Sequence, residues 1–143
     1  MKLNEVKFEL LRCGKNESLK ENIHYLSKTC SRIEEKRIVK DLGVLMSSSN
    51  SFTDHIDNVI NKGKQISSWI LRSFHCRNQN EMLVLWNSLA LPIVEYCSVL
   101  WSPSKIHDIQ RIEQLQWSFL RKIKGTYGLN YWQFLSKFKT YYL

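Results

Sequence analysis

The hydrophobic pattern changes its period at Ser51, and this change constrains the fold more than any other feature of the 143-residue sequence. Before Ser51 the chain has short alternating runs bounded by turn residues, which are typical of strands. After Ser51 the apolar side chains recur at the spacing of one helix face. The first such set is Phe52, Ile56, Val59, Ile60, Ile66, Trp69, Ile70 and Phe74. We therefore expect an α+β, mainly α fold, in which a short N-terminal β-hairpin segment precedes a bundle of three to four helices.

The N-terminal third contains the expected strands. Val6–Leu10 alternates apolar and charged residues, and Asn22–Leu26 is a weaker candidate. The charged segment Ser31–Lys36 is expected to be a turn or loop. Arg37–Met46 has strand-like composition, and Gly43 inside it indicates a bulge or a close approach by another backbone.

Three further helices are expected after the first. The second begins near Asn78 or Asn80, is apolar nearly all round and should be buried, and Pro92 should kink or split it. Ser102–Pro103, a capping serine followed by proline, predicts the start of the third helix. A short fourth helix is expected over roughly Asn130–Lys139.

Charge is unevenly distributed along the chain. There are 21 basic and 13 acidic residues, a net charge of +8. Residues 1–40 hold 10 basic and 6 acidic residues, residues 41–104 hold 4 and 5, and residues 105–143 hold 7 and 2. Two basic ends suit a protein that meets a polyanion, of which nucleic acid is the commonest. A basic surface without a partner is the alternative, and charge alone does not decide between them.

Several classes of protein are excluded by missing features. The sequence has no Gly-rich phosphate loop, no Gly-x-Ser-x-Gly and no His-Glu-x-x-His. The four cysteines form no Cys-x-x-Cys pair, so we expect no zinc site and free thiols in a reducing compartment. There is no run of eighteen apolar residues and no apolar signal region at the N-terminus. We therefore expect an intracellular protein, nuclear or cytoplasmic, that is neither secreted nor bound to a membrane.

The acidic residues do not form an active site in the sequence. Glu34 and Glu35 stand in a charged segment, which is typical of a solvated face. Glu95 lies in an otherwise apolar helix, where a buried carboxylate needs a partner. We expect a structural hydrogen bond there, near the Pro92 kink, and no catalytic role.

A set of ordered motifs spans nearly the whole chain. The most specific is P-x-x-E-Y-x-S-x-x-W-x-P, which fixes six residue choices within Leu91–Pro103. The others lie in Leu3–Gly14, Val39–Val44, Ser51–Ile56, Trp69–Arg77, Ile112–Ile123 and Tyr131–Leu135. Together these motifs resemble the C-terminal part of reverse transcriptases from non-LTR retrotransposons of the jockey and related LINE-like groups.

The resemblance implies a division of the chain. Residues 1–50 match the end of the palm with polymerase motifs D and E, the latter being the primer grip. Residues 51–125 match the thumb, and residues 126–143 match the start of a C-terminal connection helix. The family's metal-binding carboxylates precede motif D, and no Asp-Asp box occurs here. We therefore expect a truncated fragment that lacks its palm and fingers, has no ligand for the parent's Mg²⁺ and does not polymerise DNA alone.

The resemblance also implies roles for nine residues in gripping an RNA–DNA template–primer duplex. Lys7 matches the motif D lysine, which assists the leaving pyrophosphate, although a solvent-facing strand lysine is favoured in an isolated fragment. The primer grip is matched by Lys40, Asp41, Leu42 and Gly43, for which a bulged hairpin packing on the helices is the alternative. The thumb face that contacts phosphates is matched by Lys62, Lys64, Arg72 and Arg77, for which a solvated helix face is the alternative.

Other cations and the tryptophans have simpler interpretations. Arg121, Lys122 and Lys124 lie at a helix C-terminus, where they complement the helix dipole. Tryptophans can stack on bases, but at helical spacing we expect at least the first three to be core residues. The five are Trp69, Trp86, Trp101, Trp117 and Trp132. Two alternatives to a polymerase fragment stay open: a free-standing basic helical nucleic-acid-binding module, and a non-functional remnant with exposed apolar helix faces.

Overall fold

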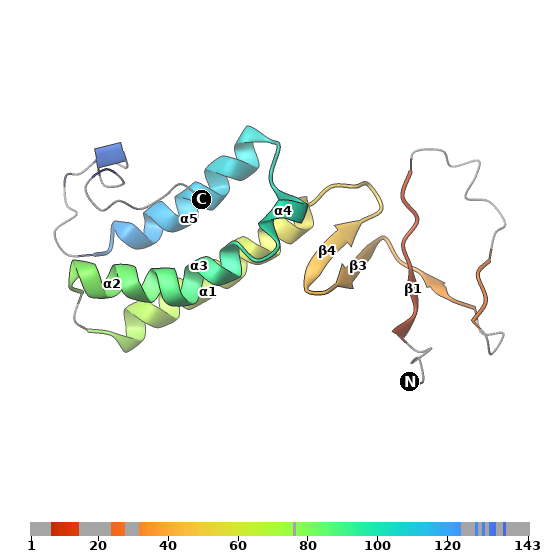
Figure 1. The fold of residues 1–143 in the computed structure, drawn as a ribbon, viewed down its shortest axis with the longest axis horizontal. Coiled ribbons are helices and arrows are strands. Elements are labelled where there is room, and N and C mark those ends of the chain that lie inside the picture. The colour runs from red at the N-terminus through yellow and green to blue at the C-terminus, as the bar shows by residue number, and fades with distance from the viewer. Residues whose placement is uncertain are drawn as a thin grey trace. The chain divides into compact units, whose positions relative to one another are not determined.

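The fold is known from a computed structural model of the chain. It describes residues 7–14, 24–27, 32–75 and 77–123, together with residues 128, 130, 132, 133 and 136. The chain divides into two compact units, Met1–His55 and Ile56–Leu143. The fold is α+β and mainly helical, as the change of hydrophobic period predicts (Figure 1).

The part of the first unit that the structure describes contains four short strands. They are β1 (Glu9–Leu10), β2 (Glu34–Glu35), β3 (Ile38–Asp41) and β4 (Val44–Ser47). β1 pairs with β2 in parallel, whereas β3 and β4 form an antiparallel hairpin. The expected weaker strand at Asn22–Leu26 lies partly outside the described residues; of its described part, Leu26 forms an isolated antiparallel bridge with Arg32.

Ion pairs hold β1 against β2. Lys36 Nζ lies 2.5 Å from Glu9 Oε1, and Arg12 Nε lies 3.3 Å from Glu35 Oε2. The backbone N–H of Lys36 also donates to the Leu10 carbonyl at 2.9 Å. The prediction that Ser31–Lys36 is a turn or loop is therefore wrong for Glu34–Glu35, because a distant segment supplies strand pairing and opposite charges.

The β3–β4 hairpin turns through two residues. Leu42 and Gly43 have φ values of 45° and 93°, and the register runs unbroken to the pair Asp41↔Val44. Two positive φ values are the property of the tight hairpin turns whose twist matches that of the strands. Gly43 thus serves a tight turn, and the predicted bulge is wrong.

The second unit begins within a long helix, α1 (Thr53–Ser73). At the start of α1, the Ser51 hydroxyl accepts a hydrogen bond from the Thr53 N–H at 3.3 Å. A buried stripe follows, formed by Ile56, Val59, Ile60, Gly63, Ser67 and Ile70. Gly63 lies where α1 meets its neighbours, because a Cβ placed on it would be 2.5 Å from Leu115 Cδ2 and 3.3 Å from Val94 Cγ2.

The predicted second helix is a run of three helical segments. They are α2 (Gln79–Leu85), the π-helical segment η3 (Trp86–Ala90) and α3 (Leu91–Val94). Proline lacks an N–H and its ring clashes with the carbonyl four residues earlier. The Leu91 N–H, one residue before Pro92, donates to Trp86 five residues back. The chain thus accommodates Pro92 by widening one helical turn into a π-bulge, the form in which π-helix usually occurs within α-helices.

Burial of this run is one-sided. Met82, Trp86, Ala90 and Val94 are buried, and the Trp86 ring stacks on Phe119 with centroids 4.9 Å apart. Other apolar side chains of the run are exposed, namely Val84, Leu89 and Ile93. The prediction that the run is buried all round is therefore wrong for the described structure.

A short segment and one further long helix complete the bundle. α4 (Ser98–Trp101) leads to α5 (Ile106–Leu120), and in Figure 1 α5 lies along the α2–η3–α3 run. The predicted start at Ser102–Pro103 is wrong, because Ser102 ends α4 in an extended conformation, as residues before proline do. The predicted fourth helix falls mostly outside the described residues, although Trp132 and Gln133 are helical.

The tryptophan prediction is confirmed at two of its three positions. Trp86 and Trp101 are buried, but Trp69 is 51% exposed. Trp69 precedes Ile70 by one residue and therefore lies about 100° from it around α1, beyond the buried stripe. Among the described residues, no helix is long and apolar enough to cross a membrane.

Candidate nucleic-acid interface

The candidate primer-grip residues form the tip of the β3–β4 hairpin in the first unit. Lys40 and Asp41 are exposed at the end of β3, and Leu42 is 83% exposed at the turn. Gly43 follows at φ 93°, a conformation that glycine adopts without strain. The turn therefore presents backbone and a lysine to solvent, which is what close approach to a nucleic-acid strand requires. Lys7 is also exposed, ahead of β1 in the same unit.

Beneath this hairpin, a buried histidine connects β4 to the start of α1. His55 is 3% exposed, and its Nδ1 accepts a hydrogen bond from the Leu45 N–H at 3.2 Å. Since Nδ1 accepts, the neutral ring carries its proton on Nε2. The motif containing His55 thus has a structural role here, which fixes the hairpin to the first turn of the helix.

The candidate thumb cations lie on α1 and in the segment after it. Lys62, Lys64 and Arg72 are exposed, and Arg77 is partly buried before α2. At 3.6 residues per turn, Lys62 and Lys64 stand near opposite edges of the solvent-facing arc of α1, and Arg72 lies between them. The three cations therefore line a broad face and do not form one tight cluster.

One exposed acid, Asp54, lies in the first turn of α1 on its solvent-facing side, five full turns before Arg72. Residues 58–80 contain these four cations and no Asp or Glu. None of the four forms an ion pair within the described residues, whereas Arg12, Lys36 and Arg111 are all paired. The acid nearest along the chain, Asp57, is bound to the Arg111 guanidinium.

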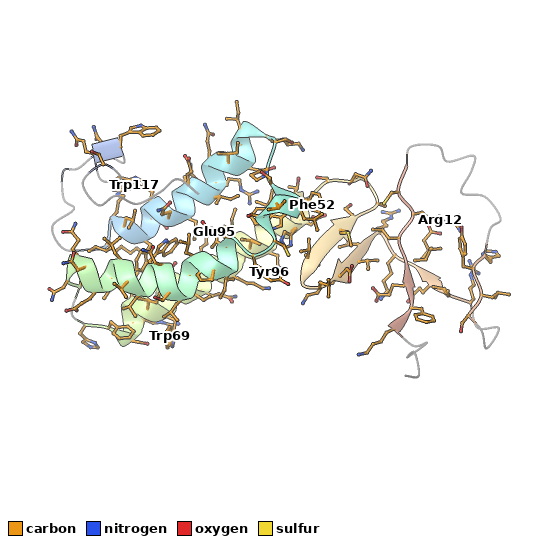
Figure 2. All side chains as sticks on the ribbon, viewed as in Figure 1. Arg12, Phe52, Trp69, Glu95, Tyr96 and Trp117 are labelled. Atoms are coloured by element: carbon orange, nitrogen blue, oxygen red, sulfur yellow. The ribbon has the colours of Figure 1, made fainter. Side chains whose placement is uncertain are left out.

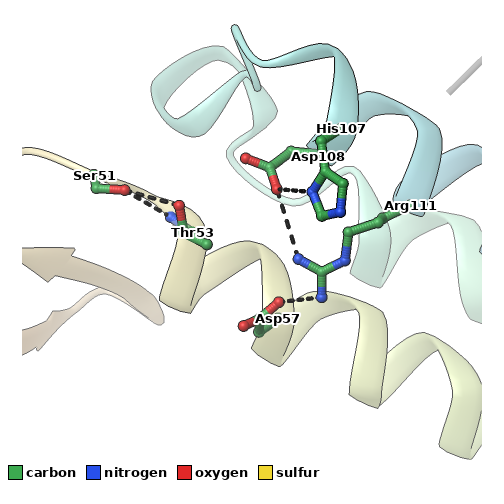
Figure 3. A network of polar contacts seen from close by, with 6 residues as sticks. All are labelled: Ser51, Thr53, Asp57, His107, Asp108 and Arg111. Atoms are coloured by element: carbon green, nitrogen blue, oxygen red, sulfur yellow. Dashed lines mark hydrogen bonds and ion pairs between the residues drawn. The ribbon is translucent and has the colours of Figure 1, made fainter.

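Asp57 and Arg111 belong to a network that joins α1 to α5 (Figure 3). Arg111 Nη1 also lies 3.6 Å from Asp108 Oδ1, and His107 Nδ1 lies 3.6 Å from the same oxygen. Asp108 is buried in the first turn of α5, where the helix dipole favours a carboxylate. The network links α1 to α5 and pairs the charge of Asp57, whose side chain stays 46% exposed, with the Arg111 guanidinium.

The most specific sequence motif forms an elbow between α3 and α5. Cys97 adopts a left-handed conformation with φ 54°, and the Ser98 N–H donates to the Glu95 carbonyl at 3.0 Å. The indole N–H of the buried Trp101 donates to the Tyr96 carbonyl at 2.7 Å. These contacts explain why the motif requires tryptophan at a fixed distance from Tyr96.

The side chains of the elbow differ from the sequence expectation. Glu95 is exposed, and its carboxylate has no hydrogen bond or ion pair among the described residues, so the predicted structural bond is wrong. Glu95 lies at a pocket of about 480 Å³ between the elbow and α5, with Val94, Trp101 and Ile112 in its wall. Coulombic repulsion from Cys97, and a hydrogen bond between the two side chains that favours the protonated phenol, raise the pKa of Tyr96 above its ordinary value of 10.0.

Sequence reasoning missed the exposed aromatic residues of this interface. Trp69 and Phe74 were assigned to the buried helix face, yet both are exposed and their rings meet edge to face at 6.5 Å. The signal that could have found Trp69 is its helical angle, which matches that of Lys62, seven residues earlier.

The described residues offer no metal site, and comparison with known proteins identifies no relative. Within the described ranges, no three His, Cys, Asp or Glu side chains meet where they could hold a metal ion. No protein-family model, no curated protein and no solved structure matches this chain.

Proposed function

We propose that this chain binds an RNA–DNA template–primer duplex through its phosphates, as a thumb-like fragment related to non-LTR reverse transcriptases of the jockey and LINE-like groups. The order of motifs along the sequence supports the relationship, and the mainly helical bundle after residue 51 is compatible with a thumb. The chain does not polymerise DNA alone, because its sequence has no Asp-Asp box to hold the two metal ions of phosphoryl transfer.

One observation carries the proposal: after Asp54 and the ion-paired Asp57 at the start of α1, residues 58–80 contain four cations and no acid. A cation that is already ion-paired must lose its partner before it contacts a phosphate. The side chains of Lys62, Lys64 and Arg72 are exposed and, within the described residues, form no ion pair. They can therefore neutralise phosphates directly and release the counterions that those phosphates hold.

Such contacts predict a particular kind of binding. Phosphate contacts fix the position of a protein on a duplex but carry no sequence information. Each contact adds about 0.9 to the slope of log affinity against log salt concentration for double-stranded DNA. We expect binding of the RNA–DNA hybrid to be independent of sequence and to weaken steeply with salt.

The test compares two triple variants that remove the same charge. In one, Lys62, Lys64 and Arg72 are changed to Gln. In the control, the exposed cations Lys105, Arg121 and Lys122 are changed to Gln. Affinity for a fluorescent RNA–DNA hybrid is measured by anisotropy over a series of salt concentrations.

We expect the α1 variant to lower the salt slope by roughly 2 to 3, and the control to leave most of the slope intact. An equal loss in both variants would mean that net charge alone attracts the hybrid. A flat salt dependence of the unmodified chain would contradict the proposal, and so would template-dependent synthesis in a primer-extension assay with Mg²⁺.

The exposed apolar side chains favour a second candidate, a remnant that no longer has the partner that covered it. Val84, Leu89, Ile93, Val99 and Leu100 are all exposed on the helical unit, and Val99 is 99% exposed. Exposed patches of this kind promote association. Gel filtration with circular dichroism decides: a helical monomer that binds the hybrid supports the first candidate, whereas concentration-dependent association without binding supports the second.

A further inference from the structure

Two exposed aromatic rings lie near the candidate phosphate-binding cations, Trp69 within α1 and Phe74 directly after its last residue. Trp69 is 51% exposed and Phe74 is 39% exposed. Their rings are perpendicular, with an interplanar angle of 86° and centroids 6.5 Å apart. Figure 2 shows Trp69 on the side of α1 that faces away from α5 in this view. Phe74 thus supports one edge of the Trp69 ring and leaves much of the ring accessible.

The cations flank this ring at distances set by helix geometry. Lys62 precedes Trp69 by seven residues, so it lies about 10 Å away along the axis and within about 20° of the same angle. Arg72 follows Trp69 by three residues and is a neighbour on the helix surface. The Arg72 Nε donates to the Ser68 carbonyl at 3.3 Å, which holds the guanidinium along the helix.

A concave apolar surface adjoins the supporting ring. A pocket of about 550 Å³ is lined by Phe74, Met82, Val84 and Leu85, with His75 at its polar edge. Its volume is in the range of small-ligand sites. The one acid of its lining, Glu81, accepts a hydrogen bond from the Asn78 side-chain amide at 3.2 Å.

We propose that Trp69 is a stacking platform for an unpaired base of the bound nucleic acid, whose phosphates contact Lys62 and Arg72. This inference rests on the proposed function and specifies which form of the hybrid the chain prefers. Bases inside a duplex are stacked on each other, so the Trp69 ring can reach only a base that lies outside the paired region. The preferred ligand is therefore an RNA–DNA hybrid with a single-stranded overhang.

Charge favours a nucleic-acid strand over an apolar protein surface at this position. An apolar partner would remove water from Lys62 and Arg72 without pairing them, which is costly. A strand supplies a phosphate for each cation and a base for the ring, and this combination of cations and aromatic rings is common in single-strand binding.

The experiment uses the full chain and three RNA–DNA hybrids: blunt, with a five-nucleotide RNA overhang, and with the same overhang made of abasic nucleotides. Trp69→Ala is compared with Trp69→Phe, which keeps a smaller ring, and with Trp132→Ala, which removes another exposed tryptophan. Circular dichroism checks that each variant keeps its helices.

We expect the unmodified chain to bind the overhang hybrid more tightly than the blunt or the abasic hybrid. Trp69→Ala should weaken binding of the overhang hybrid by about 5- to 150-fold, which is the stacking contribution of one base. Binding of the blunt hybrid should stay unchanged, Trp69→Phe should lose less, and Trp132→Ala should lose nothing. The overhang should also quench tryptophan emission in the unmodified chain and not in Trp69→Phe.

The outcomes separate this inference from the function on which it rests. If all hybrids bind equally, with a steep salt dependence and no effect of Trp69→Ala, the stacking platform is refuted and the phosphate-binding function stands. If Trp69→Ala impairs the blunt and overhang hybrids to the same extent, the ring acts through the fold and the inference is again refuted. If no hybrid binds, the proposed function fails and the inference fails with it.

Discussion

Replacing Gly63 by alanine tests how closely α1 packs on the rest of the helical unit. Alanine is about 1 kcal/mol better than glycine inside a helix, so at a roomy site the change would stabilise the protein. Here the added Cβ would lie 2.5 Å from Leu115 Cδ2, and that side chain is itself buried. Overpacking of this kind costs about 1 to 3 kcal/mol. We therefore expect Gly63→Ala to lower the free energy of unfolding by about 1 kcal/mol.

A double-mutant cycle with Leu115→Ala isolates the cause. Leu115→Ala alone should cost about 2 to 5 kcal/mol, because it leaves a cavity in the core. In that background the Gly63→Ala methyl has room, so the same change should stabilise the protein by about 1 kcal/mol. Urea unfolding followed by circular dichroism measures all four free energies. The argument is refuted if Gly63→Ala stabilises the unmodified chain, or if its effect is the same in both backgrounds.

Three further predictions concern the hairpin, the elbow and the β1–β2 pairing. Leu42→Asn should raise the free energy of unfolding by about 0.5 to 1 kcal/mol, because asparagine tolerates the positive φ of 45° better than leucine does; Leu42→Ala, whose Cβ meets the same penalty, should give no such gain in urea unfolding. Trp101→Phe should cost about 1 to 2 kcal/mol by the same measurement, because it removes the 2.7 Å hydrogen bond to the Tyr96 carbonyl, and an unchanged stability would mean that the elbow does not depend on this bond. A hydrogen bond and the charge of Glu9 raise the pKa of Lys36 above 10.5. The stabilisation of the fold by this ion pair is therefore complete below pH 10.5 and is lost as the pH rises through the higher pKa of the folded state. In Glu9→Gln, an NMR titration of the Lys36 side chain should give a pKa closer to the ordinary value, and an unchanged midpoint would contradict the assignment.

The long helices could be predicted from the sequence because their periodicity is a local property. Ile56, Val59, Ile60 and Ile70 are buried on one side of α1, as the spacing requires. Trp69 could not be placed by the same test, because an apolar residue at the edge of the stripe satisfies the period whether or not a neighbour covers it. Its exposure depends on where α5 and α3 lie, and the pattern of α1 alone does not contain that information.

The strands show a different limit. The Leu42–Gly43 turn is local, so the hairpin itself was predictable, whereas the pairing of β1 with β2 joins Glu9 to Lys36 across 27 positions. A charged segment such as Ser31–Lys36 is typical of a loop, and its strand pairing can be predicted only when the oppositely charged partner segment is known. Pro92 correctly predicted a disruption, and the structure accommodates it by a π-helical turn, whose first residue, Trp86, stacks on Phe119.

The most specific family motif, Leu91–Pro103, and the residues that carry the proposed binding lie in different parts of the helical unit. Within the motif, Trp101 and Tyr96 form a hydrogen bond that turns the chain, and this role would persist in a fragment that binds nothing. The proposed binding depends on Lys62, Arg72 and the exposed ring of Trp69; Arg72 and Trp69 lie in the matched stretch Trp69–Arg77, and Lys62 lies outside the matched motifs. The motif therefore supports a shared architecture, and a binding function requires its own test. Charge removal on α1 and ring removal at Trp69 supply that test independently, because the first changes the salt slope whereas the second changes only the preference for unpaired bases.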